Sequence, residues 1–152
     1  MTAFDRELLD PINRRLLEEL QADARLSMAE LGRRINLSAP AVADRVQRLE
    51  RAGIISGYRA LVDPKAIGFP IGVIVRIRPA TSRLHQIPEL AREVPEVVEC
   101  HRITGDDCFF VRLQLRSLDD LEDILDRFIV FGQTTTSIVH SSPIEARPLP
   151  LG

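Results

Sequence analysis

The sequence is poor in cysteine and in aromatic residues, and it lacks any long apolar run. It contains two cysteines, no tryptophan and 5% aromatic residues. No apolar stretch approaches the roughly 20 residues that a helical membrane span requires, and the polar N-terminal stretch, which carries Asp5, Glu7 and Asp10, does not have the pattern of a secretory signal. We therefore expect a cytoplasmic protein without a membrane anchor. In that compartment Cys100 and Cys108 stay reduced rather than forming a structural disulfide.

The totals are those of an ordinary globular chain, but the charge is unevenly distributed. The 152 residues are enough for one domain or two small ones. The net charge is −2, yet residues 33–51 carry five arginines against two acidic residues, whereas residues 117–126 carry five acidic residues and no basic one. Most charge runs are solvated faces, so this asymmetry needs support from spacing before it indicates a partner.

The first part of the chain has the periodicity of helices. Between residues 8 and 20, leucines and an isoleucine recur at intervals of three and four, which predicts an amphipathic helix. Ser27 is followed three residues later by Glu30, the pattern of a capping box. This pattern predicts a short helix over 28–35.

A second start signal follows directly. Ser38 is a preferred helix cap and Pro40 suits the first helical turn, so another helix is predicted to run to about Ala52 and to end at Gly53. Residues 54–62 predict a small hairpin or wing.

The second half of the chain alternates between strand and helix patterns. The predicted elements are strand 73–78, helix 82–94, strand 97–104, strand 109–116, helix 118–129 and strand 134–141. This βαββαβ order is that of a ferredoxin-like fold, whose sheet has helices on one face only. The first strand is apolar on both faces, because Ile74 lies between Val73 and Val75. We therefore expect a partner's sheet to cover the open face and form a homodimer.

The helix over 40–51 has two chemically distinct sides. Val42, Val46 and Leu49 fall on one side and predict contact with the domain core. Small and charged residues fall on the other side or precede the helix, as in a recognition helix that enters the major groove. The predicted DNA-contacting residues are Ser38, Ala39, Pro40, Ala41, Asp44, Arg45, Arg48 and Arg51. The same spacing also fits an ordinary helical hairpin with a solvated basic face.

Particular stretches resemble the Lrp/AsnC (leucine-responsive regulatory protein) family. The N-terminal matches are LDPINRRLL at 9–17, LQADAR at 20–25, ELG at 30–32, LS at 37–38 and RVQRLERAGIISGY at 45–58. The C-terminal matches are VVECHRITGD at 97–106 and TTTSIV at 134–139. Together they cover about residues 7–145, in two independent halves.

The resemblance implies an α+β protein with three parts. These are a winged helix-turn-helix DNA-binding domain over 1–62, a hinge over 63–70, and a ferredoxin-like effector-binding and oligomerisation domain over 71–152. It also implies sequence-specific, nucleoid-associated transcription control on double-stranded DNA, tuned by a small effector that is an amino acid in this family. Dimers of such proteins often assemble into octamers.

In the family, the effector lies between sensor domains and contacts a loop and the last strand. Carried over to this chain, the effector-binding residues are Gly105, Asp106, Asp107, Cys108, Thr134, Thr136, Ser137 and Ile138. The family loop often reads Gly-Asp-aromatic-Asp, whereas Asp107 here takes the aromatic place and Cys108 the second acidic place. Either Asp107 pairs with the effector's ammonium group instead, or the effector class differs. The threonines also simply suit a strand.

The residues disfavour three other functions. A metal or redox site at Cys100, His101 and Cys108 is disfavoured, because neighbours on a strand point to opposite faces and the spacing matches no zinc pattern. An enzyme is disfavoured because no catalytic motif is present, so no catalytic residue, metal or cofactor is expected. A sensor module without DNA binding is disfavoured by the intact set Arg45, Arg48 and Arg51.

Overall fold

The computed structural model describes residues 6–151. The contacts within it define two compact units. Residues 6–60 and 144–151 form the first unit, and residues 61–143 form the second.

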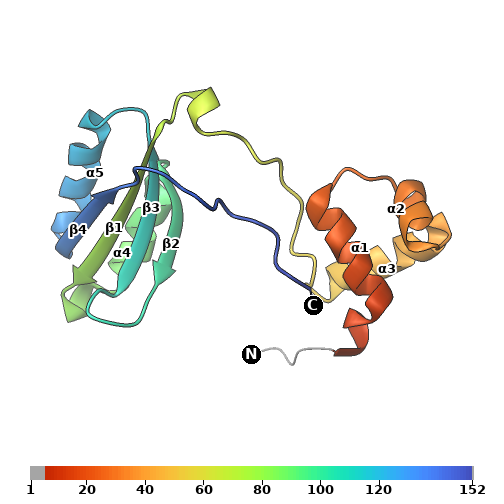
Figure 1. Cartoon of the computed structure of the whole chain (residues 1–152). Coiled ribbons are helices and arrows are strands. Elements are labelled where there is room, and N and C mark those ends of the chain that lie inside the picture. The colour runs from red at the N-terminus through yellow and green to blue at the C-terminus, as the bar shows by residue number, and fades with distance from the viewer. Residues whose placement is uncertain (1–5, 152) are drawn as a thin grey trace. The chain divides into compact units, whose positions relative to one another are not determined.

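The first unit is a bundle of three α-helices (Figure 1). A short 3-10 helix, η1 (Arg6–Leu9), precedes α1 (Pro11–Ala22), α2 (Met28–Ile35) and α3 (Ala39–Arg51). The predicted caps are confirmed, since the hydroxyl of Ser27 accepts from the Glu30 amide at 3.1 Å and that of Ser38 from the Ala41 amide at 3.4 Å. The buried core consists of Leu16, Leu17, Leu20, Leu31, Ile35, Val42, Val46 and Leu49.

The turn between α2 and α3 is tight and depends on Gly32. The Leu37 amide donates to the Gly32 carbonyl at 2.9 Å, and Asn36 ends α2 in the left-handed conformation with φ 58°. A Cβ atom at Gly32 would lie 2.4 Å from the Leu37 carbonyl oxygen. Only glycine therefore allows the backbone of the turn to approach α2 this closely.

The predicted hairpin over 54–62 is absent. From Ala52 to Pro70 the structure contains a single regular element, the 3-10 helix η2 (Lys65–Ile67), and no strand. A strand needs a neighbouring backbone to form its hydrogen-bond ladder, and the side chains here are mostly exposed, Leu61 by 83%. The prediction failed because apolar alternation does not supply that neighbour.

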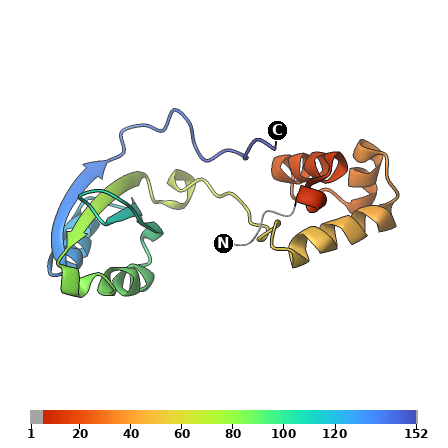
Figure 2. The same ribbon diagram turned by 90° about the horizontal axis from the view of Figure 1, so that it is seen from below.

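The second unit is a four-stranded antiparallel sheet with helices on one face (Figures 1 and 2). Its elements are β1 (Ile71–Pro79), η3 (Thr81–Arg83), α4 (Gln86–Glu93), β2 (Val97–Arg102), β3 (Phe109–Leu115), α5 (Asp119–Ile129) and β4 (Gly132–Ile138). The strand order is β2-β3-β1-β4, and each neighbouring pair is antiparallel. The predicted βαββαβ order is confirmed.

The two faces of this sheet differ in polarity. Residues of β1 and β3 pack with α4 and α5 in one core, which includes Val75, Val111, Ile87 and Phe128. The open face is more polar than predicted. Its central apolar side chains, Ile74 and Phe110, are half-buried, and their neighbours are Arg76, Arg112, Thr135, Ser137, Glu99 and His101. The homodimer stays a prediction. The open face is not extensively apolar, so it does not supply the reason for which the dimer was expected.

Candidate DNA-binding surface and effector pocket

The outward side of α3 carries a small group of charged side chains. Arg48 forms an ion pair with Asp44 one turn earlier, at 2.6 Å, with the two side chains 53% and 59% exposed. Arg51 is also exposed, and no ion pair involving it occurs within residues 6–151. Ion pairs as exposed as that of Arg48 are weak, so both guanidinium groups are accessible to a phosphate or a base edge.

The start of α3 is formed by small side chains. Ser38 and Pro40 are exposed, whereas Ala39 and Ala41 are half-buried. The first amides of a helix point outward along the axis and attract anions. Absence of bulk at this end therefore lets the helix approach a DNA backbone or groove closely.

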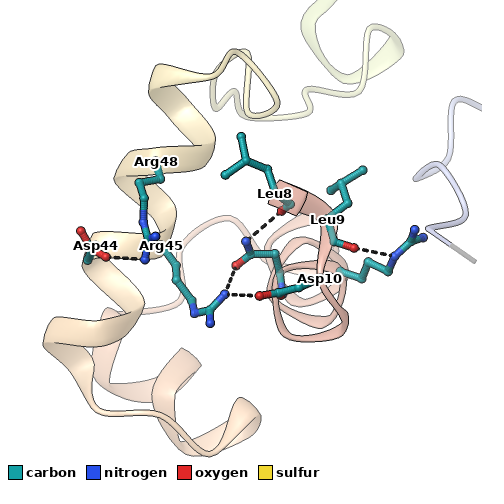
Figure 3. A network of polar contacts seen from close by, with 8 residues as sticks. Leu8, Leu9, Asp10, Asp44, Arg45 and Arg48 are labelled. Atoms are coloured by element: carbon teal, nitrogen blue, oxygen red, sulfur yellow. Dashed lines mark hydrogen bonds and ion pairs between the residues drawn. The ribbon is translucent and has the colours of Figure 1, made fainter. Parts of the chain in front are cut away.

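Arg45 has a different environment from Arg48 and Arg51. One of its Nη atoms lies 2.7 Å from Asp10 Oδ2 and 3.0 Å from Asn13 Oδ1 (Figure 3). The side chain of Arg45 is only 22% exposed, and Asn13 is buried and donates to the Leu8 carbonyl at 2.8 Å. Arg45 therefore joins α3 to the start of α1 instead of presenting a free charge.

The same network sets the ionisation of Asp10. Its carboxylate caps α1 by accepting the Asn13 amide at 2.6 Å. Partial desolvation alone would raise the pKa of Asp10, but the hydrogen bonds from the Asn13 amide and Arg45, together with the charge of Arg45, lower it below its usual value. Asp10 is thus stabilised in its charged form.

A polar cavity lies on the open face of the second unit. Its volume is about 480 Å³, and it is lined by Arg76, Arg78, Ile103, Thr104, Asp106, Asp107 and Thr135. Arg76 lies 3.6 Å from the Asp107 carboxylate, and Arg78 lies 3.7 Å from that of Asp106. Guanidinium and carboxylate groups in one small cavity match the two charged groups of a zwitterion.

The structure brings together only part of the predicted effector set. Asp106 and Asp107 line the cavity, and Gly105 adopts φ 109° in the same loop. Cys108 instead packs against the sheet core, and its amide donates to the Ile77 carbonyl at 2.9 Å.

The predicted residues of β4 divide between the two faces of the sheet. Thr134, Thr136 and Ile138 lie opposite Ile77, Val75 and Val73, whose side chains face the helices. Ser137 lies opposite Ile74 on the open face, and Thr135 lines the cavity on that face. The effector assignments on β4 therefore stay a prediction.

Arg76 and Arg78 were missed by the sequence analysis. They alternate with the buried residues Val75 and Ile77 along β1, so both side chains point to the open face. The alternation of the strand could have identified them, because it places these two arginines on one face of the sheet. The resemblance directed attention to the loop and β4 instead.

The two cysteines were the remaining candidates for a metal or redox site. Cys100 and Cys108 are free thiols, and burial raises the pKa of Cys100. No cluster of three metal-ligating side chains occurs among the described residues. Across residues 6–151, no helix has the length and apolar character to cross a membrane.

Comparisons with known proteins agree with this architecture. Residues 9–56 match a family model described as winged helix-turn-helix DNA-binding, and residues 72–149 match the Lrp/AsnC ligand binding domain. The chain is 37% identical over 133 residues to the HTH-type transcriptional regulator LrpC of Bacillus subtilis, covering 88% of this chain and 92% of LrpC. It is 35% identical to the leucine-responsive regulatory protein of Escherichia coli K12 over 120 residues, covering 77% of this chain and 73% of that protein.

A solved structure confirms the fold. The structure of Bacillus subtilis LrpC superposes with a TM-score of 0.85 at 36% identity, covering 91% of this chain and 98% of LrpC. The chain therefore belongs to the Lrp/AsnC family of DNA-binding transcriptional regulators. It combines a DNA-binding domain with a ligand-binding domain and is a regulator, not an enzyme.

Proposed function

We propose that α3 is the recognition helix and that its exposed basic face contacts double-stranded DNA. The observation that carries this proposal is the exposure of Arg48 and Arg51 on the side opposite the buried residues Val46 and Leu49. The residues in contact are Arg48 and Arg51, with Asp44 and the small residues Ser38, Ala39, Pro40 and Ala41 at the start of the helix. Arg45 acts from within the domain by holding α3 against α1.

We further propose that an amino acid is the effector and that it binds at the cavity of the open sheet face. The Escherichia coli relative is, by its name, leucine-responsive. Asp107 is suited to the effector's ammonium group, and Arg76 and Arg78 are suited to its carboxylate. Asp106 lines the same cavity, Gly105 precedes it in the loop, and Ser137 lies further along β4 on the open face, whereas Thr134, Thr136, Ile138 and Cys108 would act through the strand backbone or the core.

The regulator is proposed to act as a homodimer in the cytoplasm, associated with the nucleoid. Two recognition helices then contact half-sites about 34–36 Å apart, or a multiple of that distance. Further association to an octamer fits the family. An effector changes this system only by binding one arrangement more tightly than another. Light scattering that gives a monomer mass at micromolar concentration would contradict the dimer.

The experiment that tests DNA recognition is fluorescence anisotropy at physiological salt. The duplex comes from just upstream of the protein's own gene, and a scrambled duplex of the same composition is the control. Specific recognition is expected to give a preference of about 10³-fold or more. Equal binding that collapses as salt rises would instead indicate contact with phosphates alone. No binding to either duplex would contradict the proposal.

A further inference from the structure

The last residues of the chain pack with the DNA-binding unit and not with the sheet that precedes them. Strand β4 ends at Ile138, and residues 144–151 belong by their contacts to the first unit. We call residues 144–151 the C-terminal segment. Its end lies beside α1 (Figure 2).

Two side chains of α1 hold the backbone of this segment. The Gln21 amide group donates to the Leu149 carbonyl at 3.2 Å and accepts the Leu149 amide at 3.0 Å. Arg14 donates to the Leu151 carbonyl. Arg14 and Gln21 are two turns apart on one side of the helix, so the C-terminal segment runs antiparallel to α1.

The Gln21 side chain binds the backbone of the C-terminal segment, as a protein binds an extended peptide. The carboxamide of Gln21 presents one donor and one acceptor, as a neighbouring backbone would. Leu149 itself is 75% exposed, so its backbone and not its side chain is bound. The half-buried Leu151 packs against the core of the first unit.

The sequence of the C-terminal segment is suited to this extended binding. Pro148 and Pro150 flank Leu149. Each proline fixes its own φ and biases the residue before it toward extended backbone, so less conformational freedom is lost on docking. Because the prolines have no amide hydrogen, Leu149 supplies the sole backbone donor of this tripeptide, and Gln21 accepts it.

We propose that the side of α1 bearing Arg14 and Gln21 is a docking site for this chain's own C-terminal segment. Docking adds a second, non-covalent attachment of the chain to the first unit, in addition to the covalent connection through residues 61–70. The C-terminal segment follows β4 along the chain, and β4 borders the proposed effector cavity through Thr135. Docking and release of the segment therefore change how tightly the DNA-binding unit is tethered to the sensor unit.

Methyl NMR on the full-length chain tests this docking without DNA or effector. Leucine and isoleucine methyl groups are labelled, and the Leu151 signal is assigned by its loss in Leu151→Met. We expect cross-peaks between the Leu151 methyls and methyls of the first unit's core. Gln21→Ala is expected to abolish them, since it removes both bonds to Leu149. Arg15→Ala, at an exposed position of the same helix, is expected to retain them.

The same spectra distinguish release from misfolding. Alanine is the best helix former, so the signals of the buried residues Leu16, Leu31 and Leu49 should be unchanged in Gln21→Ala. If that variant is nevertheless misfolded, Gln21→Met serves instead, because methionine is also a good helix former and lacks both the amide donor and the carbonyl acceptor. Absence of Leu151 cross-peaks in the wild type, or their persistence in the folded Gln21 variant, overturns the proposal.

A mixed sample tests whether the segment belongs to the same chain. Chains labelled only on leucine are unfolded and refolded together with chains labelled only on isoleucine. Docking within one chain predicts no Leu151 cross-peak to an isoleucine methyl in this mixture, although a uniformly labelled sample shows it. Any Leu151 cross-peak to an isoleucine methyl in the mixture joins two different chains and would overturn the assignment to the same chain.

Discussion

Arg45 and Asp10 form an ion pair of 2.7 Å that joins the middle of α3 to the residue capping α1. Because Arg45 is mostly buried and also bonds Asn13, we expect Arg45→Ala to lower the free energy of unfolding of the first unit by about 1–2 kcal/mol. Arg48→Ala, which removes an exposed pair on the same helix, should cost at most about 0.5 kcal/mol. Differential scanning calorimetry measures both. Equal losses would show that the buried network has no special role.

The contribution of this ion pair should depend on pH. The pKa of Asp10 is lowered in the folded protein from 3.8, so the unfolded chain binds the proton more readily. The stabilisation is therefore complete above the unfolded value and is lost as pH falls through the lower folded value. We expect the destabilisation by Arg45→Ala to be constant from pH 7 to about pH 5 and to shrink below about pH 4.

Asp10→Asn is the control for the pH dependence. It keeps a side-chain acceptor for the Asn13 amide but has no charge to titrate. In this background, urea unfolding should show that the effect of Arg45→Ala no longer changes across the acid range. A pH dependence that survives in Asp10→Asn would assign it to another carboxylate.

Gly32→Ala should disrupt the helix-turn-helix specifically. The added Cβ would meet the Leu37 carbonyl 2.4 Å away, which is backbone that cannot rotate aside. The turn must then open, and we expect a loss of about 2–4 kcal/mol in the stability of the first unit together with loss of duplex binding. Arg33→Ala, the next residue and 75% exposed, is the matched control. Calorimetry should show the transition of the second unit unchanged.

The fold was predictable because its determinants are local. Ser27, Ser38 and Gly53 mark helix ends by their own backbone preferences, and apolar spacing identifies the buried faces of α3 and β1. The hairpin over 54–62 failed for the opposite reason, because pairing depends on a distant backbone. Alternation of apolar residues indicates extended chain, and it cannot show that a neighbour is present.

Residue spacing alone indicates a candidate site only where a single helix defines it, and the two loop aspartates of the cavity came from the family resemblance. The exposed side of α3 follows from helical periodicity, but the engagement of Arg45 with Asp10 joins residues far apart in sequence. The cavity likewise combines β1 with the loop after β2, so Arg76 beside Asp107 required the strand order. The docking of the C-terminal segment on Gln21 rests on bonds between residues near opposite ends of the chain.

Arg48→Ala and Arg51→Ala should each weaken duplex binding. If a side chain contacts phosphate, affinity falls similarly for all duplexes and the slope of log K against log salt decreases by about one. If it contacts a base edge, the loss is about 1–3 kcal/mol on the specific duplex alone. Arg127→Ala removes the same charge from the second unit and is the control. Unchanged affinity in both variants would remove this face of α3 from the interface.

Asp107 and Asp106 should differ in their effect on effector binding, although both are loop aspartates. Asp107 is 21% exposed and lies within 4 Å of both Arg76 and Arg78, whereas Asp106 is 94% exposed. A partly desolvated carboxylate binds an ammonium group more strongly than a fully hydrated one. We therefore expect Asp107→Asn to weaken binding of the active amino acid by about 10- to 100-fold.

Asp106→Asn is the matched control, since it makes the same chemical change in the neighbouring residue. Its effect should stay within about three-fold, because an exposed carboxylate contributes well under 1 kcal/mol. Calorimetry first identifies the active compound among the common amino acids, and then compares the two variants with it. Equal losses of affinity in the two variants would indicate that the summed negative charge of the loop attracts the effector, and not Asp107 in particular. Undiminished affinity in both would place the amino acid away from this cavity, and the second cavity between α4 and β2, which includes Arg92 and Arg102, would then become the site to test.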